Sequence, residues 1–461
     1  MRFPLLRVLA LSVVLLVPAT MLIAQDQTPA PAEEAPNPNG EQPEPTAEER
    51  ASASRDPLEI YSDLNLFGEI FDRIRAEYVD PPDEKELIRA AIQGMLTSLD
   101  PHSGYLPPAD YDDTRQDISG QFGGLGIEVM MEDGVIRVVS PIDDTPAARA
   151  GILTNDYIVE LDGVSIQGLT LDEAVEKMRG PIGTPITVTI VREGVAEPLE
   201  FELTRANIAL RAVRWSMEGD VAVLRLLRFS EQAYIGIERA IEAIYKERDG
   251  VAPKGIILDL RNNPGGLVDQ SVYVADAFLD QGAVVLTRGR SEAESARYDA
   301  APDPLDAQLA DVPVVVLING GSASASEIVA GALQDHKRAT LVGTRSFGKG
   351  SVQTIISLGP DGAMRLTTAR YYTPENRSIQ ALGITPDIEI LQKVPAEFAG
   401  RDEIIGEAGL AGHITIEGQE ETSVGSSVYV PAEKEDDTQL QYAIKLINGE
   451  ETNPAYPPVA E

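Results

Sequence analysis

Short apolar runs alternate with helix-patterned segments from Val221 to about Ile390, and this alternation constrains the fold of the chain more than any other feature. The runs read VAVLRLLRF, GIILDL and VPVVVLIN, with helices predicted around Ile235 to Tyr245, after Gly266 and from Ser326 to His336. Runs that are apolar throughout are typical of strands buried on both faces of a sheet, and strands joined through helices are typical of α/β domains. The sequence therefore predicts an α/β core in this part of the chain.

A smaller β-rich module is predicted between Gly120 and about Arg205, where the apolar pattern changes to a period of two. Asp133-Gly134 and Asp162-Gly163 are turn signals between its short strands. One helix is predicted inside the module, from Leu171 to Arg179, with Thr170 as its N-cap.

Two amphipathic helices are predicted ahead of this module, separated by Asp80-Pro81-Pro82. Apolar residues recur there at three- and four-residue steps: Leu64, Phe67, Ile70, Phe71 and Ile74, and then Leu87, Ile88, Ala91, Ile92, Met95 and Leu96. After Val394 the pattern fades into acidic sequence with one more predicted helix, from Leu440 to Ile447.

The first residues predict export. Arg2 and Arg7 precede an apolar run from Val8 to Val17 that continues to Ala24, which is typical of a secretory signal. The segment is either cleaved or retained as a membrane anchor, so we expect a periplasmic protein, free or attached to the cytoplasmic membrane. Residues 25–57 are dense in Pro, Glu and Ala and predict a disordered tether.

Charge and cysteine content exclude several classes of protein. The chain of 461 residues carries 74 acidic and 38 basic residues, a formal net charge of -36, which argues against nucleic acid or anionic membrane surfaces as partners. With zero Cys, a cysteine protease and a disulfide framework are excluded.

The most informative stretch is LINGGSASASEIVAG, from Leu317 to Gly331. A buried strand ends there, two glycines allow a tight turn, and a helix begins at the serines, so that a hydroxyl lies at the positive end of a helix dipole. Backbone N–H groups at this place can stabilise an oxyanion. The plainer interpretation is a capping box, in which Ser324 caps the helix and Glu327 is its partner.

A serine nucleophile needs a base, and the histidines are poorly placed to supply one. His336 lies twelve residues beyond Ser324 on one predicted helix, roughly 18 Å along its axis. His102 and His413 lie in no motif. The candidate base is therefore Lys349, since a lysine can act as a base when burial lowers its pKa.

Lys349 lies in RSFGKGS and is followed by a strand-patterned run, SVQTIISL, in which Gln353 falls on the same side as Lys349. The amide of Gln353 can orient the amine; otherwise Lys349 is a solvated loop residue and Gln353 an exposed strand residue. The stretch GTRSFGK also matches the start of a P-loop. Gly350 replaces the Mg-binding Ser or Thr, however, and a strand follows where a helix is required, so we reject nucleotide binding.

Two glycine-rich stretches are candidates for binding backbone oxygens or a carboxylate. DLRNNPGG, ending at Gly265 and Gly266, is either a simple turn or a donor of N–H groups to an oxyanion. Gly124, Leu125, Gly126 and Ile127 precede the first strand of the β-rich module. Their N–H groups can hold a peptide carboxylate while the strand pairs with the peptide.

These motifs together resemble the C-terminal processing peptidases, a family of serine proteases. GSASASEIVAGALQDHKRA and GTRSFGKGSVQ resemble the family's nucleophile helix and lysine loop, and the spacing of 25 residues from Ser324 to Lys349, with Gln353 four further on, resembles its Ser-Lys-Gln set. DLRNNPGGL resembles its oxyanion loop, AIQGMLTSLDPHSGYL its N-terminal helical region, and GQFGGLGIEV through EAVEKMRGPIGTPITVTIVR its PDZ domain. The resemblance extends from about Leu58 to Leu391.

The resemblance implies a crotonase- or ClpP-like α/β protease core with an inserted PDZ domain and an N-terminal helical region. It selects Ser324 over Ser322 and Ser326 as the nucleophile, and it implies that the N–H group of Gly265 or Gly266 lies beside that of Ala325 in an oxyanion hole. The expected segments are a signal peptide or anchor at 1–24, a tether at 25–57, an N-terminal helical region at 58–115, the PDZ domain at 116–205, the protease core at 206–400 and an acidic C-terminal region at 401–461.

The implied activity is that of a serine endopeptidase that recognises protein C-termini with an apolar last residue and cleaves exported or envelope proteins without a metal or other cofactor. An activating adaptor protein and a homo-oligomer formed through the N-terminal helices are further expected partners. Two alternatives differ in class. An inactive peptide-binding scaffold is disfavoured because Ser324 and Lys349 are both present, and an acyl-CoA enzyme is disfavoured by the export signal and the PDZ domain.

Overall fold

The computed structural model describes residues 57–132, 134–142, 144–400, 402–416, 418, 420–421 and 425–458. The predicted signal segment, the tether up to residue 56 and the turn residue Asp133 lie outside the described residues. The described residues divide into two units, with the boundary between Pro82 and Asp83. Within the described ranges, no helix is both long enough and apolar enough to cross a membrane.

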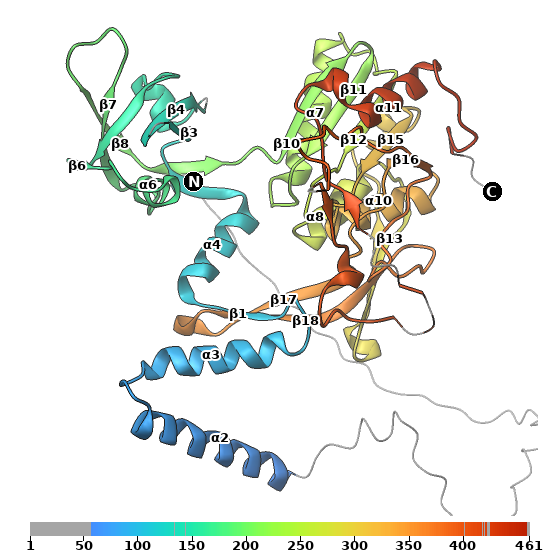
Figure 1. Ribbon diagram of the computed structural model, residues 1–461. Helices are drawn as coiled ribbons and strands as arrows, with labels where there is room; N and C mark the ends of the chain where they lie inside the picture. The colour runs from blue at the N-terminus through green and yellow to red at the C-terminus, as the bar shows by residue number, and fades with distance from the viewer. Residues whose placement is uncertain are drawn as a thin grey trace, which may run out of the picture. The chain divides into compact units, whose positions relative to one another are not determined.

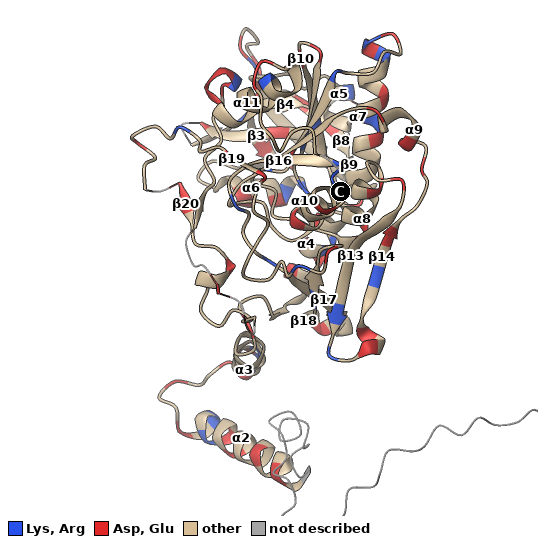
Figure 2. Cartoon of the chain, turned by 90° about the vertical axis from the view of Figure 1, so that its right-hand side faces the viewer, with Lys and Arg blue, Asp and Glu red and all other residues tan. Residues whose placement is uncertain are grey.

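The described part of the first unit contains helix α2 (Pro57–Glu77), the first of the two predicted amphipathic helices (Figure 1). Acidic residues occur along its length and its basic residues, Arg73 and Arg75, lie near its C-terminal end, as the colours of Figure 2 show. The apolar residues along one side of this helix are exposed to solvent in the single chain. The exposed fractions of Leu64, Phe67 and Ile70 are 59%, 51% and 52%.

The second predicted helix is α3 (Glu84–Thr97), which begins where the Asp83 carboxylate accepts the N–H groups of Lys85 and Glu86. A turn then leads into strand β1 (Gly104–Leu106) and helix α4 (Pro108–Ser119). The sequence did not predict α4, because its residues PADYDDTRQDIS are polar nearly throughout and none of them is buried. Its remaining signals are the Pro at its first position and Gly120, which ends it in the left-handed conformation.

The β-rich module has one sheet of order β3-β4-β5-β7-β8, with β6 paired to β5. Its elements are β3 (Ile127–Glu132), β4 (Val135–Pro141), α5 (Pro146–Ala150), β5 (Tyr157–Leu161), β6 (Val164–Ser165), α6 (Leu171–Met178), β7 (Pro185–Val191) and β8 (Leu199–Thr204). Helix α6 begins after Thr170, the predicted N-cap, which forms a capping box with Glu173. A separate antiparallel ribbon of β2 (Gln121–Gly124) and β9 (Ala206–Ala209) joins the two chain segments that enter and leave the module.

The α/β core has a six-stranded sheet of order β10-β11-β12-β15-β16-β19, in which all pairs except β10 with β11 are parallel. Its strands are β10 (Val213–Glu218), β11 (Val221–Leu226), β12 (Gly255–Asp259), β15 (Val314–Ile318), β16 (Ala339–Gly343) and β19 (Ile388–Glu389). Every residue of β12, β15 and β16 is buried, as apolar runs between two layers of helices require.

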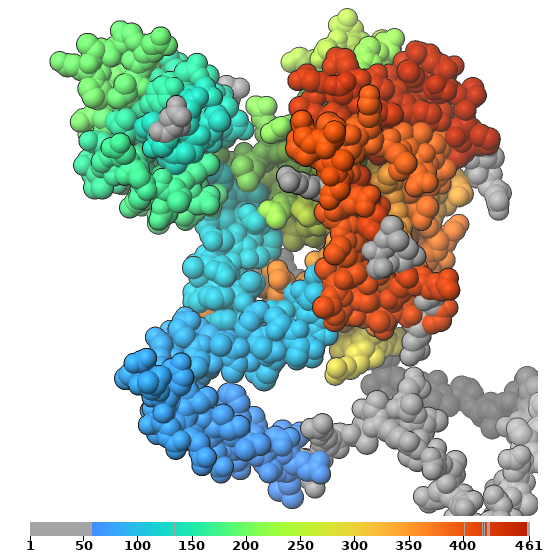
Figure 3. Space-filling model, viewed as in Figure 1, coloured from blue at the N-terminus to red at the C-terminus, as the bar shows by residue number. Residues whose placement is uncertain are grey.

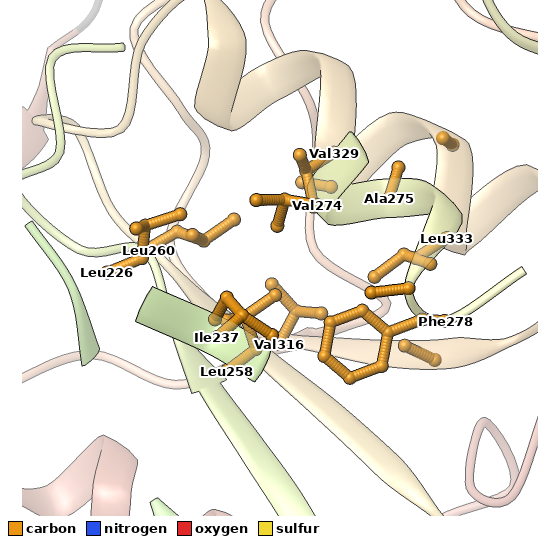
Figure 4. Packing of buried hydrophobic residues seen from close by; sticks show 14 of the residues in the cluster. Leu226, Ile237, Leu258, Leu260, Val274, Ala275, Phe278, Val316, Val329 and Leu333 are labelled. Carbon is orange, nitrogen blue, oxygen red and sulfur yellow. The ribbon is translucent and has the colours of Figure 1, made fainter. Parts of the chain in front are cut away.

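Helices cover both faces of this sheet. The helices α7 (Ala233–Glu247), α8 (Val268–Asp276) and α10 (Ala325–Asp335) pack on one face. Figure 4 shows this layer, where Ile237 of α7, Val274 of α8 and Val329 of α10 lie close to Leu258 and Val316 of the strands. The alternate residues of the same strands, such as Ile257 and Val315, point to the other face and pack against α11 (Thr438–Asn448).

A second, five-stranded sheet lies beside the core helices, with order β1-β18-β13-β14 and β17 paired to β18. Its core strands are β13 (Gly282–Gly289), β14 (Ala296–Ala300), β17 (Ser351–Ser357) and β18 (Ala363–Tyr372). The remaining elements are η1 (Glu292–Glu294), α9 (Asp306–Leu309), η2 (Gly359–Asp361), β20 (Glu403–Ile404), η3 (Glu407–Gly409), β21 (Ser426–Ser427) and η4 (Lys434–Asp436). Because β1 pairs with β18, the turn after α3 is attached to the core.

The C-terminal region is part of the core layers, although its sequence is weakly patterned. The buried side chains of α11 complete the apolar layer on the face of the sheet that carries Ile257 and Val315. These side chains are Leu440, Ala443, Leu446 and Ile447. Figure 3 shows the C-terminal residues, in red and orange-red, lying directly against the orange residues of the core.

Candidate active site

Ser324 lies in a strained turn between β15 and α10. Its backbone has φ 54° and ψ -112°, a region that side-chain-bearing residues rarely adopt and that costs of order 1–3 kcal/mol. The residue is half-buried and directly precedes the first helical residue, Ala325. The turn therefore presents the hydroxyl at the N-terminus of α10, where the helix dipole favours a developing negative charge.

Ser324 and Glu327 have the predicted arrangement of a capping box, but its two halves are not equally well formed. The Glu327 carboxylate accepts the N–H of Ser324 at 2.7 Å. The Ser324 hydroxyl lies near the N–H of Glu327 as in a capping box, yet it makes no well-formed cap hydrogen bond, because that N–H donates to the Ser324 main-chain carbonyl at 2.8 Å. The hydroxyl is thus not committed to capping the helix.

Lys349 is half-buried in the loop between β16 and β17. Within the described ranges its amine makes no hydrogen bond or ion pair. Burial lowers the pKa of Lys349, and the charge of Arg365 acts in the same direction, whereas Glu407, Glu327 and Asp100 act in the opposite direction. A lysine without a bound partner and with a lowered pKa is suited to accept a proton. No hydrogen bond joins its amine to the Ser324 hydroxyl among the residues that the structure describes.

Glu327 connects the nucleophile turn with the lysine loop, and its side chain is fully buried. One carboxylate oxygen accepts the N–H groups of Ser324 and Lys349 at 2.7 and 2.9 Å, and the other accepts the N–H of Gly348 and the hydroxyl of Ser346, both at 2.6 Å. Burial raises the pKa of Glu327 to about 7, against the effect of these hydrogen bonds. From the sequence alone Glu327 was predicted only as a capping residue, and its position three residues after Ser324 was the available signal.

Gln353 does not contact Lys349 in the way its sequence spacing suggested. Strand β17 begins at Ser351, so Lys349 precedes it, and the register shifts between Val352 and Gln353. Even spacing therefore does not place Lys349 and Gln353 on one side of a regular strand, contrary to the prediction. The Gln353 amide donates to the hydroxyls of Ser351 at 2.9 Å and Thr367 at 3.3 Å.

The oxyanion loop packs directly on the nucleophile turn. At Gly265, where φ is 100°, a methyl group would lie 2.8 to 3.0 Å from Ala323 O, Ser324 Cβ and Ala325 N, so that only glycine allows this approach. The N–H of Gly265 donates to the Asn263 side chain at 2.9 Å. The N–H groups of Gly266 and Ala325 make no hydrogen bond within the described ranges. Of the two glycines, Gly266 is thus the one with an available donor.

A buried ion cluster anchors the base of this loop to the C-terminal region. Arg261 binds Asp259 on one side and Asp437, the N-cap of α11, on the other, each through two hydrogen bonds of 2.7 to 2.9 Å between its guanidinium and the carboxylate. All three side chains are almost fully buried. The negative charges raise the pKa of Arg261 further, and Arg261 lowers the pKa of Asp259. The C-terminal helix therefore helps to hold the oxyanion loop.

The three histidines are engaged elsewhere. His336 Nε2 contacts the carbonyl oxygen of Ala283 at 2.6 Å, and His413 Nε2 contacts Glu421 at 2.7 Å. His102 Nε2 lies 2.9 Å from both carboxylate oxygens of Glu407. Each imidazole thus has a partner other than Ser324.

The glycine-rich loop of the β-rich module lies beside a free strand edge. Leu125 belongs to the module's apolar core, and the carbonyl oxygens of Leu125 and Gly126 accept the N–H groups of Ala147 and Ile142. The N–H groups of Leu125 and Gly126 make no hydrogen bond to any described residue. Strand β3, which begins at Ile127, pairs with β4 on one side and forms the edge of the sheet. This arrangement suits a carboxylate at the loop and a peptide strand along β3.

Comparison with known protein families finds three matches along the chain. Residues 220–390 match Peptidase family S41, residues 123–203 match the PDZ domain, and residues 22–109 match the Activating protease CtpB N-terminal domain.

Curated relatives match over most of the chain. A carboxy-terminal-processing protease of Bartonella bacilliformis is 53% identical over 398 residues, which cover 86% of this chain and 91% of that protein. A carboxyl-terminal-processing protease of Synechocystis sp. is 38% identical over 338 residues, which cover 71% of this chain and 76% of that protein. Among solved structures, a photosystem II D1 C-terminal processing protease is 28% identical and covers 74% of this chain and 97% of its own, with a TM-score of 0.40. The chain therefore belongs to the carboxy-terminal-processing proteases of peptidase family S41 and is a serine-type peptidase with a PDZ domain.

Proposed function

We propose that this protein is an endopeptidase that uses Ser324 as nucleophile and Lys349 as general base. The observation that carries the proposal is the Glu327 carboxylate, which accepts hydrogen bonds from the backbone N–H groups of both residues. One buried side chain thereby fixes the spacing between a strained serine turn and a lysine of lowered pKa.

The reaction follows from these groups. Neutral Lys349 takes the proton of the Ser324 hydroxyl while its oxygen attacks the carbonyl carbon of a peptide bond. The N–H groups of Ala325 and Gly266 stabilise the negative oxygen, and Lys349 returns the proton to the leaving amine. Water then attacks the acyl-enzyme with Lys349 again as base. Catalytic hydrogen bonds are often long in unbound enzymes and tighten with substrate, which fits the open Ser324–Lys349 pair. Gln353, held by Ser351 and Thr367, stays a candidate for orienting the lysine in that complex.

The PDZ domain supplies recognition in this proposal. The loop Gly124 to Ile127 binds the C-terminal carboxylate of a protein whose last residue is apolar, and β3 pairs with its extended chain. The exposed apolar stripe of α2 supports assembly through the N-terminal helices, either with a second copy or with an activating adaptor. The N-terminal signal pattern supports export, with exported or envelope proteins as substrates.

The test is cleavage of an unfolded protein with an apolar C-terminus, followed by mass spectrometry of the products. We expect cleavage by the full chain and loss of cleavage in Ser324→Ala and Lys349→Ala. The same substrate with a C-terminal Asp should be cleaved more slowly, because the apolar end is what the PDZ domain binds. Retained cleavage in Ser324→Ala would overturn the nucleophile, and a wild-type protein that binds the peptide without cleaving it would favour the scaffold alternative.

A further inference from the structure

We propose that Glu407 is a positioning residue for Lys349 and that it makes His102, from the turn after α3, part of the support of the active site. This inference rests on the proposed role of Lys349 as the base. Glu407 lies in η3, beyond the residues that match the peptidase family, and hydrolysis itself does not use it.

The Glu407 side chain is fully buried and accepts hydrogen bonds from two segments far apart in the sequence. Both carboxylate oxygens lie 2.9 Å from His102 Nε2, and one also accepts the Gln380 amide at 3.0 Å. An ionised Glu407 can only accept hydrogen bonds, so this contact requires His102 to donate through Nε2. A carboxylate buried at this depth is stabilised only while these donors stay in place.

Glu407 holds the lysine loop on both sides of Lys349. On one side, the backbone N–H of Glu407 donates to the carbonyl oxygen of Phe347 at 3.0 Å. On the other, Gln380, which Glu407 fixes, accepts the N–H of Gly350 at 3.1 Å. Gly350 packs so closely on the backbone of Gln380 that a side chain does not fit there. One peptide group beside Lys349 is thus held by the backbone of Glu407, and the other depends on its buried carboxylate through Gln380.

His102 connects this carboxylate to the N-terminal helical region. The Asp100 carboxylate accepts the N–H groups of His102 and Ser103, each at 2.8 Å, and so fixes the turn that follows α3. Arg365 of β18 donates to the carbonyl oxygen of His102 at 2.8 Å. A displacement of α3 therefore moves His102 and, through its hydrogen bonds, the Glu407 carboxylate. Glu407 in turn acts on the lysine loop.

The charges around Lys349 predict how the pH dependence of activity changes when Glu407 is replaced. The charged groups that face its amine are Arg365 of β18, Glu407 of η3, Glu327 of α10 and Asp100 of the turn after α3, and His413 faces Glu407 from the same C-terminal segment. The negative charge of Glu407 favours the ammonium form of Lys349. Removing this charge lowers the pKa of Lys349 further, so the rise of kcat/KM with pH moves to lower pH. The plateau of kcat/KM at high pH falls at the same time, because Lys349 is displaced.

The experiment measures kcat/KM of the full chain against pH, from pH 5 to 10, for wild type, Glu407→Gln and the control Glu403→Gln. Glu403 is an exposed carboxylate of β20 in the same C-terminal segment, and it is not one of the charged groups that act on Lys349 or His413. We expect Glu407→Gln to lower the high-pH plateau by about tenfold or more and to shift the rise by about half a pH unit to lower pH. The control should change neither quantity.

His102 offers a second test that does not remove the buried charge. His102→Gln keeps a side-chain donor for Glu407 and should retain more of the plateau than His102→Ala, with thermal unfolding used to correct both for the folded fraction. An unshifted rise in Glu407→Gln, with a plateau that falls only as the folded fraction falls, would overturn the proposal. Equal plateaus for the two His102 variants would also count against it. Failure of the base assignment is separate, since it would appear as activity retained in Lys349→Ala.

Discussion

Replacing Glu327 by Gln tests whether one buried carboxylate holds the nucleophile and the base in register. The carboxylate accepts four hydrogen bonds, from Ser324 N, Lys349 N, Gly348 N and the Ser346 hydroxyl. An amide keeps only one accepting oxygen and places an NH₂ group against the other pair of donors. The least unfavourable orientation turns the NH₂ group toward Ser346, whose hydroxyl can accept, and this leaves the N–H of Gly348 without a partner.

The size of the effect follows from these bonds. An orphaned buried N–H costs about 1–3 kcal/mol, and the two bonds that remain lose the assistance of a charge. The neutral amide avoids the cost of burying a carboxylate, which offsets part of this loss. We expect a loss of about 2–4 kcal/mol in the free energy of unfolding. We also expect a fall in kcat of about 100-fold, because a displacement of about 1 Å at the reacting groups has an effect of that size.

Urea unfolding and single-turnover cleavage measure the two quantities. Leu333→Ala is the matched control, since it removes a buried side chain from the same helix roughly 13 Å beyond Ser324 and should cost about 2–5 kcal/mol. Corrected for the folded fraction, the control should keep the wild-type kcat. A Glu327→Gln variant that loses stability but keeps wild-type kcat would refute the reasoning.

Three further predictions concern the oxyanion loop and the base. Gly265→Ala should lower kcat by about 100-fold with little change in KM for short peptides, because its methyl group would collide with the nucleophile turn; peptide kinetics measure this. Asp437→Asn should lower the free energy of unfolding by about 1–3 kcal/mol, since an amide has one accepting oxygen and can replace only one of the two hydrogen bonds that Arg261 donates to Asp437; urea unfolding measures this. Because burial lowers the pKa of Lys349 and only the neutral amine accepts a proton, wild-type kcat/KM should rise with increasing pH, with a midpoint below the ordinary lysine value of about 10.4; a pH series measures this.

Much of the core fold was predictable because its strands are buried on both faces. The apolar runs that became β11, β12 and β15 need no tertiary information to be recognised, and neither does the capping box at Thr170. Helix α4 was missed because its polar sequence has no apolar period, and it forms beside other elements of the fold. The role of the C-terminal region was missed for a related reason, since α11 is short and its target is a sheet formed by distant residues.

The candidate site was predictable only in part. The strand-turn-helix pattern around Ser324 and the glycines beside Lys349 are local signals. The contacts of Glu327 with Ser346 and Gly348, and those of Glu407 with His102, join residues far apart in the chain, and no spacing rule predicts such pairs. The interpretation of Lys349 and Gln353 as strand neighbours failed because the strand begins only at Ser351 and bulges before Gln353.

The most direct test of the central claim is covalent labelling of the full chain with a fluorophosphonate, with the modified residue located by mass spectrometry. The account predicts one adduct, on Ser324, at a rate that rises with pH in the wild type and falls by about 100-fold or more in Lys349→Ala. An adduct on another serine, or labelling of Ser324 at an undiminished rate in Lys349→Ala, would contradict the proposed nucleophile and base.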